Sequence, residues 1–292
     1  MKPRDRLLAA LVALIWGLNF VVIDWGMEGV PPLLFVAIRF VVVLLPAIFF
    51  VRRPQVPWRF IIGVGLFMSL GQFALLYSSM HLGMPPGLAA LVLQAQVVFT
   101  MLIAAGALRE IPRPTQLAGA LIGSLGLAVV AFGRDAQVPL LAFLLCIGAA
   151  LSWGVGNVIS RASGAKGGLS LTVWSAVIVP VPLFALSLLI EGPQAVATAL
   201  SGLGIEAILA TLYTAVIASL VAYGIFNSLL SRHPAASVVP WILLVPVVGI
   251  VAAWLLLGEV PNTAELLGGA LMLAGLLVAQ RSGAGPFRRV RS

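Results

Sequence analysis

The chain has 292 residues, of which 61% are hydrophobic and only 9% are charged, and its formal net charge is +8. A soluble domain usually carries about 25% charged residues, so this composition excludes a protein whose surface lies mainly in water. The positive charge does not indicate nucleic acid as a partner, because that would require a basic face on a soluble fold, whereas these basic residues sort by loop.

Apolar stretches long enough to cross a bilayer recur along the whole chain. A transmembrane helix needs roughly 20 apolar residues. Ten stretches of about this length, separated by short polar breaks, predict an all-α membrane protein in a lipid bilayer. In chain order they cover residues 7–26, 33–51, 58–80, 87–108, 115–132, 139–160, 170–190, 205–230, 236–257 and 264–280.

The basic residues are distributed unevenly between alternate loops. Of the 17 Lys and Arg residues, fifteen fall on the side that carries both termini, Arg39 falls inside the second span, and Arg134 alone falls on the opposite side. Lys and Arg next to membrane helices are retained on the cytoplasmic side. We therefore expect ten spans in the bacterial inner membrane, with both termini in the cytoplasm.

The two halves of the chain resemble each other when the sequence is shifted by 149 residues. This shift aligns 108–112 (LREIP) with 257–261 (LGEVP), and the match continues into the neighbouring spans. We therefore divide the chain into two repeats of five predicted helices, 1–135 and 136–292. Because five is odd, the repeats should cross the membrane in opposite directions, an arrangement typical of secondary transporters.

These motifs resemble those of the EamA family of the drug/metabolite transporter superfamily. The resemblance rests on the duplicated Leu-x-Glu-[Ile/Val]-Pro turn, on the Arg39-Phe40 pair, and on similar elements at 16–19 (WGLN) and 153–157 (WGVGN), and it covers nearly the whole chain. It implies two inverted repeats, with the first four helices of each around a central cavity. It also implies alternating-access export of amino acids or related metabolites without a cofactor, as in exporters similar to the aromatic amino-acid and paraquat type.

Arg39 is the only basic residue predicted well inside a span, since Arg59 lies at the very start of the third. A lone Arg near the bilayer centre costs roughly 2.5–3.5 kcal/mol on insertion scales, so it should face a cavity or a partner instead of lipid. It either binds a substrate carboxylate or pairs with Asp24 or Glu28 and fixes the second helix against the first. The sequence leaves both interpretations open.

Two Trp–Asn pairs occupy related places in the repeats. Trp16 and Asn19 are three residues apart, and Trp153 and Asn157 are four apart, so each pair shares a helical face. An aromatic ring beside an amide suits a planar or amphipathic solute. The alternative is helix packing, in which the glycine after each Trp permits close approach and each Asn bonds a neighbouring helix.

Other polar residues inside the spans are candidates to contact a substrate. They are Gln72, Tyr77, Gln94, Tyr213, Tyr223 and Asn227. Gln94 and Gln96 are two residues apart and should point to different faces, so we expect at most one to meet the cavity. We expect His81, near the outer end of its helix, to be interfacial and not a proton carrier.

Prolines interrupt three spans: Pro46 in the second, Pro180 and Pro182 in the seventh, and Pro240 and Pro246 in the ninth. Each frees a backbone carbonyl and bends its helix. The second and seventh spans correspond in the two repeats, so their paired bends are candidate hinges for alternating access. Static kinks that shape the cavity are the alternative.

Small residues line the fifth and tenth spans. They are Gly119, Gly123, Gly126, Gly268, Gly269 and Gly275. Such stripes bring helices together, either within a monomer or across a dimer, and we expect the monomer. Glu110 and Glu259, which precede helix-starting prolines, are interpreted as turn residues and not as proton sites.

The acids leave the energy source open. Asp24 is the only acid well inside a span, and it lies toward the outer end of the first helix. The small multidrug-resistance relatives depend on a Glu where this chain has Leu14 and Ile15. Proton-coupled and facilitated export therefore both remain possible.

Other functional classes fit the residues less well. An intramembrane enzyme or metal site would need clustered groups, yet His81 and His233 are predicted on opposite membrane sides and Cys146 is the single cysteine. Efflux of cationic drugs is the alternative function. A nucleotide-sugar carrier would need more than one intramembrane cation for the phosphates.

Overall fold

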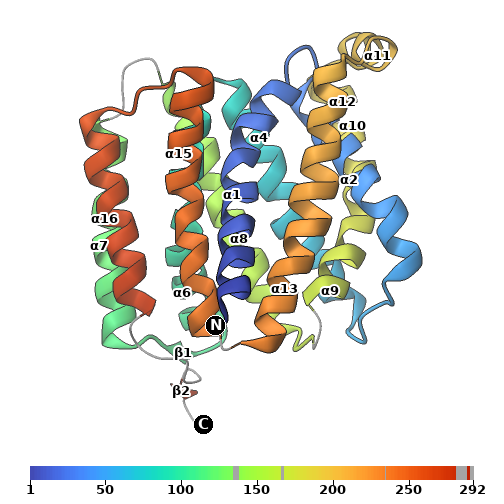
Figure 1. Ribbon diagram of the computed structural model, residues 1–292. Helices are drawn as coiled ribbons and strands as arrows, with labels where there is room; N and C mark the ends of the chain where they lie inside the picture. Colours follow the sequence, from blue (N-terminus) through green and yellow to red (C-terminus); the bar gives the residue numbers. More distant parts are fainter. Residues whose placement is uncertain (134–137, 166–167, 234, 281–287, 290–292) are drawn as a thin grey trace.

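Each predicted apolar stretch forms a helical stretch in the computed structural model, which describes residues 1–133, 138–165, 168–233, 235–280 and 288–289 (Figure 1). The first half contains α1 (Pro3–Gly26), α2 (Pro32–Phe50), α3 (Trp58–Val64), η1 (Gly65–Gly71), α4 (Gln72–His81), α5 (Pro86–Val92), η2 (Leu93–Ala95), α6 (Gln96–Ala107) and α7 (Pro114–Gly133). The second half contains α8 (Leu140–Ala162), α9 (Gly168–Ser175), η3 (Ala176–Ile178), α10 (Pro180–Ile190), α11 (Pro193–Ser201), α12 (Ile205–Leu212), η4 (Tyr213–Val221), α13 (Ala222–Arg232), α14 (Ala235–Val238), η5 (Val239–Leu243), α15 (Leu244–Leu257) and α16 (Thr263–Gln280). Two short strands, β1 (Glu110–Ile111) and β2 (Arg288–Arg289), pair antiparallel.

The helices have the length and surface of membrane spans. Within the described residues, eight are long and apolar enough to cross a membrane, and two further apolar helices, Trp241–Leu257 and Thr263–Ala279, are shorter. Large apolar side chains point outward, as with Phe50 at 87% exposure and Phe132 at 92%. Such a surface is stable in hydrocarbon, where a helix satisfies its own backbone polar groups.

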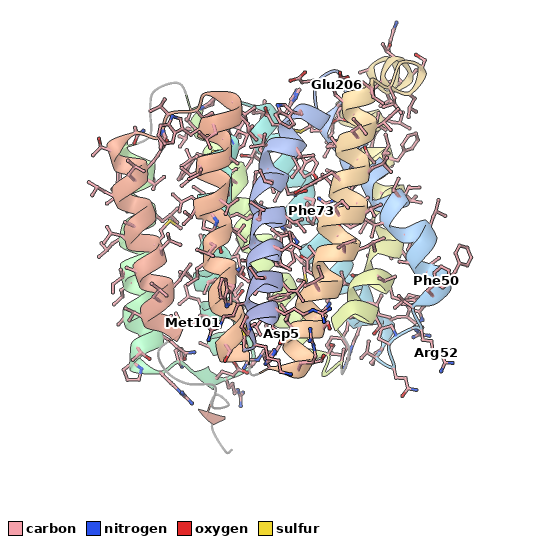
Figure 2. The ribbon with its side chains drawn as sticks, in the orientation of Figure 1. Asp5, Phe50, Arg52, Phe73, Met101 and Glu206 are labelled. Carbon is pink, nitrogen blue, oxygen red and sulfur yellow. The ribbon has the colours of Figure 1, made fainter. Side chains whose placement is uncertain are left out.

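Contacts between helix ends define the two ends of the bundle. At one end, Arg232, the last residue of α13, and His233 after it contact Asp5 in the first turn of α1, at 3.0 and 2.9 Å. At the other, the Glu191 carboxylate after α10 accepts hydrogen bonds from the N–H groups of Leu33 (2.7 Å) and Leu34 (3.3 Å) at the start of α2. Figure 2 shows Asp5 and Glu206 at these opposite ends.

The charges are segregated between these ends. The end that contains the start of α1 is called the basic end, and its described cations are Lys2, Arg4, Arg6, Arg52, Arg53, Arg59, Arg109, Arg113, Arg161 and Arg232. The opposite end is called the acidic end, and its described acids are Asp24, Glu28, Glu191, Glu206, Glu259 and Glu265. Arg134, Lys166, Arg281 and Arg291 lie outside the described residues.

Corresponding helices of the two halves run in opposite directions. The first helix, α1, runs from the basic to the acidic end, whereas its counterpart α8 ends at the basic end, where Arg161 pairs with Glu110 at 3.2 Å. The start of α1 and the end of α16 lie at the same end of the bundle (Figure 1).

Local irregularities repeat with the 149-residue shift that relates the halves. The π-helical segments η1 (Gly65–Gly71) and η4 (Tyr213–Val221) coincide under this shift. The 3₁₀ segment η2 (Leu93–Ala95) likewise overlaps η5 (Val239–Leu243). No local sequence signal predicted these segments.

The glycine stripes of α7 and α16 face each other within one chain. A β-carbon on Gly126 would lie 2.5 Å from the carbonyl oxygen of Gly268, and one on Gly275 would lie 2.5 Å from that of Gly119. Only glycine permits such close backbone approach at these crossings. These four residues therefore pack inside the monomer.

The candidate hinge prolines lie at the irregular parts of their helices or within them. Pro180 begins α10 two residues after the end of the 3₁₀ segment η3, and Pro182 lies in the same first turn. Pro240 lies in η5, Pro246 is buried in α15, and Pro46 lies within α2.

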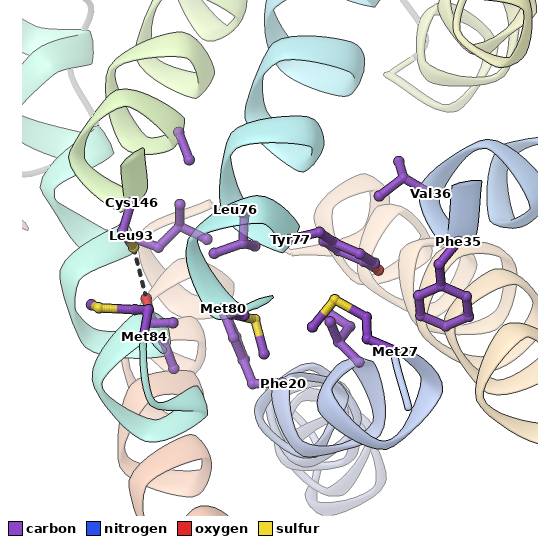
Figure 3. Packing of buried hydrophobic residues seen from close by; sticks show 14 of the residues in the cluster. Phe20, Met27, Phe35, Val36, Leu76, Tyr77, Met80, Met84, Leu93 and Cys146 are labelled. Atoms are coloured by element: carbon purple, nitrogen blue, oxygen red, sulfur yellow. Dashed lines mark hydrogen bonds between the residues drawn. The ribbon is translucent and has the colours of Figure 1, made fainter. Parts of the chain in front are cut away.

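A dense apolar core fills the half of the bundle near the acidic end (Figure 3). Tyr77, Phe35 and Met27 meet there, and Tyr77 has no exposed surface. The thiol of Cys146, also buried, lies 3.8 Å from the carbonyl oxygen of Ala89 and donates to it. This core holds together helices from both halves.

Candidate functional site

A cavity of about 520 Å³ lies between the two halves. This volume falls within the roughly 300–1,000 Å³ typical of small-molecule sites. The residues predicted to contact a substrate that line it are Trp16, Asn19, Arg39, Gln72, Gln94, Trp153, Asn157 and Tyr223.

Three other predicted contact residues do not line this cavity. Tyr77 is completely buried beside it and bonds Arg39. The hydroxyl of Tyr213 donates to the carbonyl of Ile15 at 2.9 Å, which joins η4 to α1. Asn227 lines a side chamber of about 60 Å³ that also contains Arg39.

Arg39 is held by neutral groups and an aromatic ring. Its side chain is 4% exposed. Nη1 donates to the Tyr77 hydroxyl at 2.8 Å, and Nη2 donates to Ser219 Oγ at 3.0 Å. Its guanidinium carbon lies 4.3 Å from the centre of the Phe73 ring, an arrangement that favours a cation.

The expected alternative pairing of Arg39 with Asp24 or Glu28 is not observed. In the part of the chain that the structure describes, the ion pairs involve Glu110 and Asp5 and not Arg39. The fold places Tyr77 and Ser219 on the guanidinium instead. A buried cation without a carboxylate partner retains most of its capacity to attract an anion.

A π-helical segment builds one wall of the cavity. In η4 the Ser219 hydroxyl donates to the carbonyl of Thr214, five residues earlier, at 2.7 Å. The carbonyl of Ala218 accepts a hydrogen bond from Trp16 Nε1 at 2.9 Å. The Trp16 ring packs on Tyr223, with ring centres 4.8 Å apart. The irregular helix therefore supplies the hydroxyl that binds Arg39 and the carbonyl that binds Trp16.

Both glutamines of the fourth helical stretch meet the cavity, so the expectation that at most one would do so is wrong. Gln94 and Gln96 lie at and just after the 3₁₀ segment η2, whose tighter winding changes the angle between their side chains. Gln96 Oε1 accepts from Asn157 Nδ2 at 2.8 Å, and Thr100 lies 3.2 Å from the same nitrogen. The i, i+4 spacing of Gln96 and Thr100 was the available sequence signal.

Among the described residues, two buried side-chain atoms at the cavity have no hydrogen-bond partner. Arg39 Nε is a buried donor, and Asn19 Oδ1 is a buried acceptor, and neither has a hydrogen-bond partner. Leaving such a group unsatisfied costs about 1–3 kcal/mol, so each invites a ligand group. No acidic side chain lines the cavity within the described residues.

The cavity extends from the middle of the bundle toward the basic end. Its lining there includes Gln116 in the first turn of α7 and Ala279 in the last turn of α16. On the side of the acidic end α15 packs directly on α5, since a β-carbon on Gly249 would lie 2.7 Å from the β-carbon of Ala90, which itself lines the cavity.

Comparison with known proteins identifies relatives along the whole chain. The EamA-like transporter family matches residues 6–132 and 140–280. A "Probable amino-acid metabolite efflux pump" of Salmonella typhimurium is 42% identical over 284 residues, and one of Escherichia coli is 40% identical, each alignment covering 95% of both chains. A "Probable terminal-alkyne amino-acid exporter" of Streptantibioticus cattleyicolor is 31% identical over 73% of this chain and 70% of the relative.

Proposed function

The chain belongs to the EamA-like transporter family, and we propose from this that it exports amino acids or closely related metabolites through the central cavity. It is a multi-pass protein of the inner membrane, and its family indicates a transporter and not an enzyme. The names of its relatives, amino-acid metabolite efflux pumps, support this substrate class.

We propose ten membrane spans arranged as repeats 1–135 and 136–292, with the basic end in the cytoplasm. The concentration of described Lys and Arg at that end supports this orientation. The inverted directions of the two halves support alternating access, with Pro46, Pro180, Pro182, Pro240 and Pro246 as hinges. A reporter active only in the periplasm should be inactive at the C-terminus, and strong activity there would refute the topology.

The pair of unsatisfied atoms carries the assignment. Arg39 Nε can donate to a carboxylate, and Asn19 Oδ1 can accept from an ammonium group. An α-amino acid presents both groups on one carbon. The aromatic surfaces of Trp16, Trp153 and Tyr223 would take its apolar side chain.

The lining disfavours the other cargoes. A cationic drug would enter a cavity whose described lining holds Arg39 and no acid, so like charges would repel. The phosphates of a nucleotide sugar would also meet a single cation. The protein acts as a monomer in this proposal, because the facing glycines of α7 and α16 are already packed against each other.

Counterflow in proteoliposomes tests the proposal. Vesicles preloaded with one unlabelled amino acid at a time should accelerate uptake of the same labelled compound, and amino acids with apolar side chains should be most effective. Acceleration by a cationic drug and by no amino acid would replace this function with multidrug efflux.

A further inference from the structure

Glu110 and Glu259 occupy the same turn in the two repeats, as the 149-residue shift shows. The residue before each has a positive φ, 52° at Arg109 and 72° at Gly258. Each turn is also capped alike downstream: the Arg113 N–H donates to Gln116 Oε1 at 2.8 Å, and the repeat-equivalent bond at residues 262 and 265 measures 3.1 Å. The two carboxylates are therefore presented by the same local geometry, one at each end of the bundle.

Glu259 joins two helices at the acidic end. Its Oε2 accepts a hydrogen bond from the N–H of Gly87, at the start of the fourth helical stretch, at 3.3 Å. The helices meet tightly there, since a β-carbon on Gly87 would lie 3.2 Å from the β-carbon of Ala253 in α15. The contact between Glu259 and Gly87 therefore accompanies closure of the acidic end.

The environment of Glu259 makes its charge adjustable. Burial raises the pKa of this carboxyl to about 7, the N–H of Gly87 opposes this rise, and the negative charges of Asp24 and Glu265 add to it.

Glu110 lacks the equivalent contact at the basic end. The 149-residue shift places Ala236, in the first turn of α14, at the position that corresponds to Gly87. Glu110 is 6% exposed, and Oε1 pairs with Arg161 at 3.2 Å, but Oε2 is buried without a hydrogen-bond partner. The cavity separates the fourth and ninth helical stretches on this side, because it is lined by Val97 and Leu243 of the two.

We propose that Glu110 and Glu259 are alternating latches of the transport cycle, Glu259 closing the acidic end on Gly87 while Glu110 is released, and Glu110 closing the basic end on the start of α14 while Glu259 is released. This inference rests on the proposed transport function. It explains why the buried Oε2 of Glu110 has no hydrogen-bond partner in this conformation: the partner is supplied in the other conformation of the transport cycle. Both glutamates are then positioning residues that set the balance between the two states.

A thiol-accessibility experiment tests the latches without any substrate. The reporter is Ile23→Cys in a Cys146→Ala background, because Ile23 lines the cavity near the acidic end and is 1% exposed. A membrane-impermeant maleimide added outside intact spheroplasts should label it slowly. Glu259→Ala should accelerate labelling by about three- to tenfold, the effect of losing one hydrogen bond.

Glu110→Ala should slow labelling. The side chain makes more hydrogen bonds in the state with the basic end closed and the acidic end open, so its loss should disfavour that state and reduce access from outside to the Ile23→Cys reporter. Glu206→Ala, which removes an exposed acid at the acidic end, is the matched control and should leave the rate unchanged. Should either alanine variant fail to reach the membrane, Glu259→Leu and Glu110→Leu keep similar side-chain bulk without any hydrogen-bonding group, and they should shift labelling in the same opposite directions.

Shifts in the same direction for both glutamates, no shift for either, or an equal shift in the control would overturn the latches. Because labelling needs no substrate, this result is separate from the counterflow result. If no amino acid is exchanged in counterflow but the two glutamate variants still shift labelling in opposite directions, the proposed substrate is wrong and the latch proposal is retained.

Discussion

Replacing Arg39 by Met should abolish most of the affinity for a carboxylate substrate while leaving the fold intact. Met has a similar length and is apolar, so it occupies the space without a charge. The protein loses the two hydrogen bonds to Tyr77 and Ser219, each of which has an ionised donor and contributes about 1.5–3 kcal/mol. It also gains from no longer burying a cation at 4% exposure, so the net change in stability should be small.

The effect on binding should be larger than the effect on stability. A hydrogen bond between ionised groups contributes about 1.5–3 kcal/mol, and at 4% exposure solvent screens it little. This corresponds to an increase in KM of about 10- to 100-fold. Counterflow with a labelled amino acid measures the KM, and size-exclusion chromatography in detergent checks the fold.

Tyr77→Phe is the matched control, because it removes the neutral partner of Arg39 and keeps the cation. Its KM should rise by less than about tenfold, because the cation that binds the carboxylate is still present. A folded Arg39→Met protein with wild-type KM for every amino acid would refute the assignment of Arg39 as the carboxylate ligand.

Three further changes test other parts of the structure. Gly126→Ala should destabilise the α7–α16 pair by about 1–3 kcal/mol, because the added β-carbon would lie 2.5 Å from the backbone of Gly268. Gly123→Ala is the control and should be tolerated, because its added β-carbon would lie 3.9 Å from the nearest side-chain atom. Equal melting temperatures for the two variants would contradict this packing. The stability of Glu259→Gln relative to wild type should increase between pH 5 and 8. The folded-state pKa of Glu259 is raised from 4.5 to about 7, so the wild-type protein becomes less stable as pH rises through that interval, whereas the Gln variant does not titrate there. A difference in melting temperature that stays constant with pH would argue against the shift. Pro182→Ala should slow turnover in counterflow without abolishing binding, because it permits a more regular helix after η3, and unchanged turnover would make this proline a static kink.

The helices themselves were predictable because lipid leaves the backbone few alternatives. An apolar stretch in hydrocarbon must satisfy its N–H and C=O groups internally, so hydropathy alone placed the second span at 33–51, against Pro32–Phe50 observed. The repeat was equally visible, since the turns around Glu110 and Glu259 retain the same sequence pattern.

The irregular segments were not predictable, because tertiary contacts select them. In the π-helical segment η4, the carbonyl of Ala218 accepts a hydrogen bond from the Trp16 indole, which lies 202 residues earlier in the sequence. The 3₁₀ turn of η2 brought Gln96 to the cavity beside Gln94, which the geometry of a regular α-helix does not allow.

The sequence by itself determined a membrane-embedded helical protein with two related halves, and it identified Arg39 as a residue that lipid could not surround. Only the tertiary structure decided what Arg39 contacts, since Tyr77 and Ser219 lie 38 and 180 residues away and no local pattern specifies such pairs. Local sequence determines where the helices lie, because the backbone hydrogen bonds of a helix join residues only a few positions apart. The cavity and its unsatisfied atoms depend on how distant helices pack, which is settled by contacts formed after each helix exists.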